Sequence, residues 1–554
     1  MVYRFAAAGI IVSARSPVRC RTQLERLEAP MTRMPARFAA LCSVAAIATA
    51  GTIAASRPAR AQAREPFPGL DAYITTAVHT WKIPGLSVAI VRNDSVIYAK
   101  GFGLLGAKSR TPVDERTLFE IGSSSKAFTA TLVAMLVGDG KMRWDDRLIQ
   151  YLPNFRMYDP VANEGVTLRD ALTHRSGIAR GELVWLGSGI SRDEVLHRVR
   201  FLKPESPFRS RYSYQNMMFL AAGQAAGRAA GTTWDDLVRD RIFTPLHMTA
   251  SVATSHGLTN PNVAAPHGMD RDSAYVKAPF DAENIAPAGA ILSNAVDMAQ
   301  WLRFQLSDGV VDGKRLVNAA ALRETHSPQI LAVSGGGRGG APGDTIPATH
   351  FSTYGMGWFI EDYHGALSVQ HGGNTPGMTT AVGMLPEKRF GVVVLSNMQS
   401  AALPLLLEHY IFDRALGVPM RDLSAEAYTR SLAQRQRADS VERVQASARV
   451  TTAPPLPLSA YAGTFVDSLY GEFTVSVNGD HLELKHGAMS GPLQYWNTNN
   501  FRWETALSSL TGPMFIKFDI APDKTVGGLY FGLAGDVVLI SRKASGRGGR
   551  GGTP

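Results

Sequence analysis

The most informative stretch of this sequence is Phe119-Glu-Ile-Gly-Ser-Ser-Ser-Lys126, which leads from a strand-like turn into an apolar helix. The helix carries Ala, Phe and Val at helical spacing until Gly138-Asp-Gly140 ends it. Ser123 stands at the positive end of that helix, and Lys126 follows one turn later on the same face. The alternative is a capping serine with a solvated lysine, and it fits less well because the rest of the helix is apolar. The stretch therefore predicts a nucleophilic serine beside an amine.

Two further short motifs stand next to predicted elements farther along the chain. Tyr214-Gln-Asn216 opens an apolar helix over about 214–231, and His371-Gly-Gly373 follows the strand-like segment 367–370. A glycine pair on a strand predicts that another backbone approaches it closely. Tyr495-Trp-Asn497 repeats the Tyr-x-Asn pattern, but its surroundings indicate a strand and turn. Each motif alone is weak, so their order and spacing carry the argument.

In this order and with these gaps, the motifs resemble the serine acyltransferases that include class C beta-lactamases, penicillin-binding DD-peptidases, D-aminopeptidases and related esterases. The resemblance covers about residues 68–415. It implies an α/β (α+β) fold of the beta-lactamase/transpeptidase type, with an antiparallel sheet flanked by helices. Further matches are Leu172-Thr-His-Arg-Ser-Gly177, Pro287-Ala-Gly-Ala-Ile-Leu-Ser293 and Tyr354-Gly-Met-Gly-Trp358.

The resemblance also implies catalytic roles. Ser123 would form an acyl-enzyme, and a base must first remove its proton, because a serine hydroxyl is a poor nucleophile. Lys126 and Tyr214 are the candidates for that base, acting as a shared proton relay. The backbone N–H groups of Ser123 and Asn374 would form the oxyanion hole.

The substrate-binding candidates are Asn216, His371, Gly373 and Asn374, and Asn216 would bind the substrate amide or orient Lys126. His371 stands where the beta-lactamase pattern has a lysine. Lysine is a permanent cation suited to a carboxylate, whereas histidine is mostly neutral at pH 7. We therefore expect peptide, D-amino-acid amide or ester substrates. The alternative is a beta-lactamase or DD-carboxypeptidase acting on penicillins or cell-wall peptides, and the intact motifs count against a non-catalytic binder.

Other kinds of site are not supported. Gly101-Phe-Gly103-Leu-Leu-Gly106 matches the dinucleotide fingerprint, but no helix follows it, so we expect turn glycines and no cofactor. The glycine run 334–340 is expected to be a flexible loop. The sequence has no G-x-S-x-G elbow, which argues against His174 as part of a Ser-His-Asp triad. No metal site is expected, because His371 has no second ligand at suitable spacing.

The N-terminal region carries much of the positive charge and the features that indicate export. The net charge is +10, but residues 1–63 alone carry nine arginines and two glutamates, so we expect no nucleic-acid partner. Segment 31–63 has the arginines, apolar run and small residues of a signal peptide, and residues 1–30 are interpreted as a misassigned start. Cys20 and Cys42 precede the expected cut. The mature chain is thus predicted to be periplasmic or secreted, without a stable membrane span.

The composition divides the rest of the chain. We predict a serine hydrolase domain over 64–420, a helical and Pro-rich linker over 421–457, and a disordered tail over 544–554. Period-two strands across 458–543 predict a small β-barrel, which resembles the lipocalin-like domain that some family peptidases carry. Whether that barrel binds a ligand or supports a homo-oligomer stays open at this point.

Overall fold

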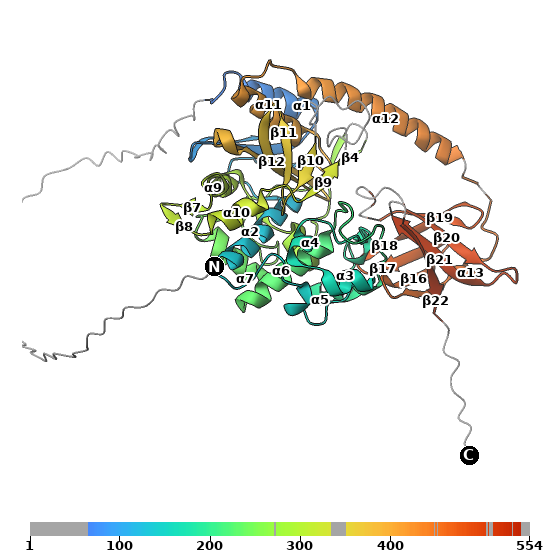
Figure 1. Ribbon diagram of the computed structural model, residues 1–554. Coiled ribbons are helices and arrows are strands. Elements are labelled where there is room, and N and C mark those ends of the chain that lie inside the picture. Colours follow the sequence, from blue (N-terminus) through green and yellow to red (C-terminus); the bar gives the residue numbers. More distant parts are fainter. Residues whose placement is uncertain are drawn as a thin grey trace, which may run out of the picture. The chain divides into compact units, whose positions relative to one another are not determined.

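A computed structural model describes residues 65–270, 273–333, 351–447, 449–450, 452–505, 508, 514–533 and 536–543 (Figure 1). The predicted leader 1–63, the glycine run 334–340 and the tail 544–554 lie outside the described residues. None of the helices in the described ranges combines the length and hydropathy needed to cross a bilayer.

The body is organised around an antiparallel sheet. Its order, within the described residues, is β2-β1-β14-β13-β12-β11-β10-β9. The hairpin predicted over Leu86–Lys100 is present, and Asn93 and Asp94 at its turn take positive φ values of 49° and 66°. The strands are β1 Gly85–Arg92, β2 Ser95–Gly103, β9 Ile330–Val333, β10 Ser352–Tyr354, β11 Phe359–Tyr363, β12 Ala366–Thr375, β13 Met378–Leu385 and β14 Phe390–Ser396.

Both faces of the sheet are buried. Successive side chains of a strand point in opposite directions, so one strand can contribute to an apolar cluster on each face. Val88 and Ile90 of β1 belong to one apolar cluster, whereas Ala89 and Val91 belong to the other. Helices α1 (Leu70–Thr80) and α11 (Leu403–Leu416) supply the first cluster, and Figure 1 shows them together beside the sheet. This two-sided burial explains why the central strands read as continuous apolar runs.

The second cluster contains α2 (Ser125–Gly138) and most of the remaining helices. Every residue of α2 from Ser125 to Leu136 is buried, as expected of a helix that is apolar all round. A 3₁₀ turn, Gly122–Ser124, precedes it. The other helices of the body are α3 Pro160–Gly165, α4 Leu168–Leu172, α5 Arg192–Arg198, α6 Asn216–Ala230, α7 Trp234–Val238, α8 Ala286–Gly289, α9 Ala295–Leu306 and α10 Ala319–Thr325.

Short two-stranded pairs complete the body, and one finding here corrects the sequence analysis. Gly101 and Gly103 lie within β2 and are not turn residues. Gly101 is needed because a Cβ there would overlap the Val113 carbonyl of the chain that crosses β2. The pairs are β3 Phe119–Glu120 with β6 Leu292–Ser293, β4 His267–Asp270 with β5 Ser273–Val276, and β7 Val310–Val311 with β8 Lys314–Arg315.

After the long helix α12 (Leu423–Ser447) and the short helix α13 (Leu458–Tyr461), eight strands form a closed barrel. The barrel closes where Phe465 of the first strand pairs with Arg542 of the last. The predicted antiparallel sheet flanked by helices and the small barrel that follows it are present, whereas the likeness to lipocalins stays a prediction. The strands are β15 Gly463–Asp467, β16 Gly471–Asn478, β17 His481–His486, β18 Met489–Asn497, β19 Asn500–Trp503, β20 Met514–Ile520, β21 Val526–Leu533 and β22 Asp536–Arg542.

Candidate active site

The nucleophile candidate Ser123 sits on the 3₁₀ turn between β3 and α2. Gly122 adopts a left-handed φ of 51°, and a Cβ at this position would lie 2.8 Å from the Asn374 backbone nitrogen. Glycine is therefore required here for both its φ and its size. The turn leaves Ser123 half-buried and brings Asn374 N beside the same turn, as the predicted oxyanion hole requires.

Lys126 lies inside the protein with no exposed surface. Its Nζ is 3.1 Å from Ser123 Oγ, 2.7 Å from Asn216 Oδ1 and 2.8 Å from the Ala288 carbonyl oxygen. Burial holds the pKa of Lys126 well below its usual range, because the ammonium form loses its hydration. A neutral amine can donate to Asn216 and Ala288 and still turn its lone pair toward the Ser123 hydroxyl.

Tyr214 reaches the nucleophile from the segment before α6. Its hydroxyl oxygen is 2.7 Å from Ser123 Oγ, and Lys126 Nζ lies 4.7 Å from the centre of its ring. The helix starts at Asn216, with Gln215 as its N-cap, so Tyr214 lies just before α6. Ser123, Lys126 and Tyr214 are thus brought together as the sequence predicted.

His174 supports this arrangement by contacting the Tyr214 segment. Its Nδ1 accepts a hydrogen bond from the Gln215 N–H at 2.9 Å, and its ring centre lies 4.3 Å from that of Tyr214. Burial holds the pKa of His174 well below its usual range. His174 is thus a neutral, packed imidazole that orients the Tyr214 segment.

Strand β12 carries His371, Gly373 and Asn374. A Cβ on Gly373 would overlap the carbonyl oxygen of Ile121, so the close approach predicted from the glycine pair is present at this position. Asn374 is exposed, and its Oδ1 accepts a hydrogen bond from Thr379 Oγ1 at 2.9 Å. The strand therefore lies directly against the turn that holds Ser123.

His371 is only 2% exposed. Its Nδ1 lies 2.6 Å from the Gly372 carbonyl oxygen, and its Nε2 lies 3.0 Å from the hydroxyl of Tyr354. The first contact requires a proton on Nδ1, and the second lets a neutral ring accept at Nε2. The imidazole is thus held in the wall of the site by protein groups at both nitrogens, and its role in substrate binding stays a prediction.

Two charged residues that the sequence analysis missed stand next to Asn216. Both oxygens of Glu182 lie 3.3 Å from Asn216 Nδ2, and Arg180 pairs with Glu182 at 2.7 Å. Their signal in the sequence was only a charged pair shortly after the Leu172–Gly177 motif. Such a pair cannot be distinguished in the sequence from an ordinary solvated loop.

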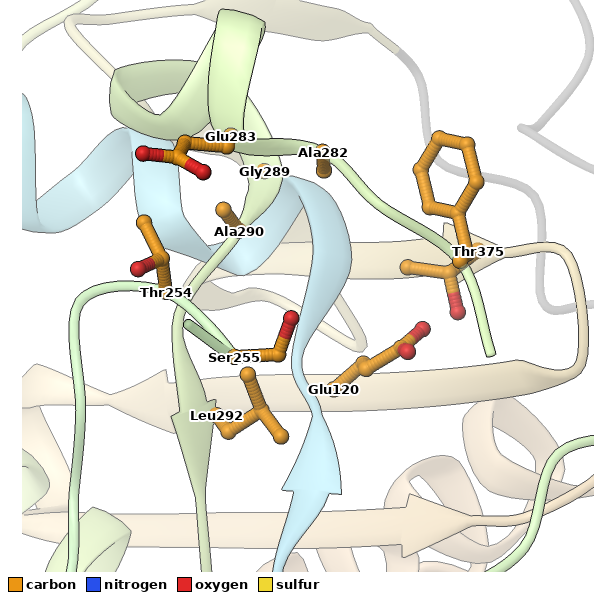
Figure 2. Close-up of a pocket in the computed structure, with 10 residues that line it drawn as sticks. Glu120, Thr254, Ser255, Ala282, Glu283, Gly289, Ala290, Leu292 and Thr375 are labelled. Atoms are coloured by element: carbon orange, nitrogen blue, oxygen red, sulfur yellow. The ribbon is translucent and has the colours of Figure 1, made fainter. Parts of the chain in front are cut away.

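A small cavity adjoins the turn before Ser123, and Figure 2 shows Glu120, Gly289 and Thr375 among its lining residues. Burial raises the pKa of Glu120 to about 7, against smaller opposing effects of Thr375 and the Phe280 backbone. Glu120 Oε2 has no hydrogen-bond partner among the described residues. The carboxyl group is therefore largely protonated below neutral pH. Across all the described residues, no three His, Cys, Asp or Glu side chains gather as a metal site.

Comparison with known families agrees with this geometry. A family model described as Beta-lactamase matches residues 70–415, a range that contains Ser123, Lys126, Tyr214, Asn216 and β12. The chain belongs to the Beta-lactamase family. A second model, a domain of unknown function (DUF3471), matches residues 447–536. This Beta-lactamase-family protein thus joins its Beta-lactamase body to a barrel that overlaps a domain of unknown function.

Individual relatives of this Beta-lactamase-family protein are distant in sequence. Over 76% of this chain and 77% of its own length, the unguisins hydrolase ungD of Aspergillus violaceofuscus (strain CBS 115571) is 28% identical. Penicillin-binding protein 4 of Amycolatopsis lactamdurans is 28% identical over 57% of this chain and 81% of its own length.

Two solved structures support the fold. The octameric penicillin-binding protein homologue from Pyrococcus abyssi has a TM-score of 0.56 at 22% identity, covering 85% of this chain and 99% of that one. A class C beta lactamase from Rhodobacter sphaeroides has a TM-score of 0.50 at 20% identity, covering 63% and 99%.

Proposed function

We propose that this protein is an exported serine acyl hydrolase that forms an acyl-enzyme at Ser123 on peptide, D-amino-acid amide or ester substrates. One observation carries the proposal. Ser123 Oγ lies within hydrogen-bond distance of two proton-transfer groups, Lys126 Nζ at 3.1 Å and the Tyr214 hydroxyl at 2.7 Å. A buried neutral amine and a phenol around one serine hydroxyl are what nucleophilic catalysis needs.

The reaction follows from these contacts. Lys126 Nζ accepts the Ser123 proton while Oγ bonds to the substrate carbonyl carbon. The backbone N–H groups of Ser123 and Asn374 hold the resulting oxyanion. When the tetrahedral intermediate collapses, the bond to the leaving nitrogen or oxygen breaks, and that atom takes the proton from Lys126 directly or through Tyr214. Water then attacks the ester under the same base and releases Ser123.

The surroundings of the nucleophile favour uncharged acyl substrates. His371 is buried, and both its ring nitrogens contact protein groups. Arg180 is the exposed cation near Tyr214, at 5.2 Å from the ring centre, but its Nε and Nη2 already bind Glu182. Among the described residues, the contacts around Ser123 thus include no fixed positive charge that is available to a substrate carboxylate. A beta-lactamase or DD-carboxypeptidase remains the second candidate, supported by the relationship to penicillin-binding protein 4.

Covalent labelling followed by a substrate panel tests the proposal. The purified protein should react with a fluorophosphonate probe, and Ser123→Ala should not, although it should unfold at the same temperature as the wild type. Among p-nitrophenyl esters, D-amino-acid anilides and nitrocefin, the first two classes should be turned over faster. Failure to label would refute a serine nucleophile, and efficient nitrocefin hydrolysis would favour the second candidate.

Export is part of the proposal and has its own test. N-terminal sequencing of the protein recovered from the periplasm or medium of its bacterial host should begin near Gln62 or Arg64. A start near Met1 would contradict both the signal peptide and the misassigned start. The homo-oligomer is tested on the same material by light scattering, since a structural relative is octameric.

A further inference from the structure

Arg180 and Glu182 reach the active site from the loop after α4. Arg180 donates to Glu182 Oε1 through Nε at 2.9 Å and through Nη2 at 2.7 Å. Gly181 between them takes a left-handed φ of 55°. The carboxylate is shielded, because the side chain of Glu182 is only 15% exposed, whereas that of Arg180 is 56% exposed.

Glu182 connects this ion pair to the proposed base through one amide. Asn216 Nδ2 donates to both oxygens of Glu182 at 3.3 Å, and Asn216 Oδ1 accepts from Lys126 Nζ at 2.7 Å. The amide can satisfy both neighbours only in this orientation, since its nitrogen must face the carboxylate and its oxygen the amine. A flipped amide would present N–H groups to the lysine and an oxygen to a negative charge.

We propose that Glu182 and Arg180 are positioning residues, in which Glu182 holds the Asn216 amide oxygen toward Lys126 and the opposite charges of the pair tune that base. The proposal rests on the proposed function, because it assigns these residues to the Ser123 hydrolase. It explains why an ion pair is placed on the loop beside Asn216. A charge there acts on Lys126 through a protein interior that screens it weakly.

The electrostatics of the site agree with the geometry. Burial lowers the pKa of Lys126 most, the negative charge of Glu182 opposes that effect, and the positive charge of Arg180 adds to it. Tyr214 and His174 are further titratable side chains near Lys126, and burial keeps His174 neutral. Removing Glu182 should therefore lower the pKa of Lys126, whereas removing Arg180 should raise it.

The test compares pH profiles of kcat/KM on a neutral ester. Activity rises with pH as Lys126 loses its proton. Glu182→Gln should move this rise to lower pH by roughly one unit, because the amine loses a stabilising negative charge. Arg180→Gln should move it to higher pH by a smaller amount, since the guanidinium is more exposed. Glu182→Asp should restore most of the wild-type profile, and Glu164→Gln, which removes an exposed carboxylate of another ion pair, should change nothing.

A second readout does not depend on turnover. In protein labelled with ¹³C at lysine Cε, the signal that disappears in Lys126→Met reports Lys126, and its titration midpoint should shift in the same opposite directions in the two variants. Opposite shifts support the proposal, and identical midpoints in wild type, Glu182→Gln and Arg180→Gln overturn it. Absence of fluorophosphonate labelling in the wild type would instead overturn the proposed function, and these titrations would still decide the role of the pair.

Discussion

The same three-residue pattern occurs in the Beta-lactamase body as Tyr214-Gln-Asn216 and in the barrel as Tyr495-Trp-Asn497. In the body, the tyrosine hydroxyl meets Ser123 at 2.7 Å. In the barrel, the hydroxyl of Tyr495 donates to the carbonyl oxygen of Thr498 at 3.3 Å, on the strand β18 and its turn. The pattern is equal in sequence, so the difference is made entirely by what the fold places opposite each side chain.

The asparagines differ in the same way. Asn216 is buried, and its oxygen accepts from a lysine that has no exposed surface. Asn497 accepts from the side chain of Asn500 at 2.9 Å, across the turn that joins β18 to β19. From this comparison we expect a polar side chain to become chemically useful where burial changes the proton affinity of its neighbour. Paired substitutions in the two regions can test this.

The largest expected effect comes from Lys126, the buried lysine beside Tyr214 in the body. Lys126→Met should lower kcat/KM on esters by roughly a thousandfold or more, because it removes the proposed proton acceptor. The exposed Lys485 of β17 serves as the matched control, and Lys485→Met should leave steady-state kinetics unchanged. A Lys126→Met protein that is folded by circular dichroism and nearly fully active would show that another group is the base.

The two tyrosines provide the next comparison. Tyr214→Phe should cost roughly a hundredfold or more in kcat, because the proton relay to the leaving group loses its hydroxyl. Tyr495→Phe removes the same atom from the barrel and should have no effect on turnover. Steady-state kinetics of both variants decide the matter, and equal activities would mean that the Tyr214 contact with Ser123 is not used in catalysis.

A third prediction compares two carboxyl groups through stability. Burial raises the pKa of Glu120 to about 7, so the folded protein keeps a proton that the unfolded chain releases near pH 4.5. The contribution of Glu120 to stability is therefore fully present below pH 4.5 and declines as pH rises to about 7, by on the order of 3 kcal/mol. Urea unfolding at pH 5 and pH 8 should show a smaller decline in Glu120→Gln.

The exposed Glu472 of the barrel is the control for that measurement. Glu472→Gln should follow the wild-type pH dependence. If Glu120→Gln also followed the wild-type pH dependence, the cost of burying the Glu120 carboxylate in the cavity of Figure 2 would be offset by a partner outside the described contacts.

The smallest effect is expected for the asparagines. Asn216→Ala should lower kcat by roughly ten- to a hundredfold, since Lys126 loses one hydrogen-bond acceptor while Ala288 O and Ser123 remain. Asn497→Ala should leave kcat unchanged. Equal values for the two variants would contradict the view that Asn216 orients the base.

The sequence predicted much of this arrangement because local pattern and chemistry coincide at Ser123 and Lys126. The helix that starts beside them is otherwise apolar, so a lysine in its first turn stands out from the pattern. His371 shows the limit, because its strand was evident but its burial against Tyr354 depends on a contact between two strands of the sheet. Glu182 was missed for a related reason, since its partner Asn216 is distant in sequence and only the fold brings them together.

The pairing of β1 with β14 has a consequence for how the chain is made. Leu86 finds its partner Ser396 only after about 300 more residues have been synthesised. At synthesis rates of ~5–20 residues per second, the β1–β2 hairpin waits tens of seconds with one edge unpaired. Such non-local pairing slows folding and exposes an apolar strand to other chains. Production of this protein should therefore depend on a chaperone that occupies the first hairpin until β14 is available.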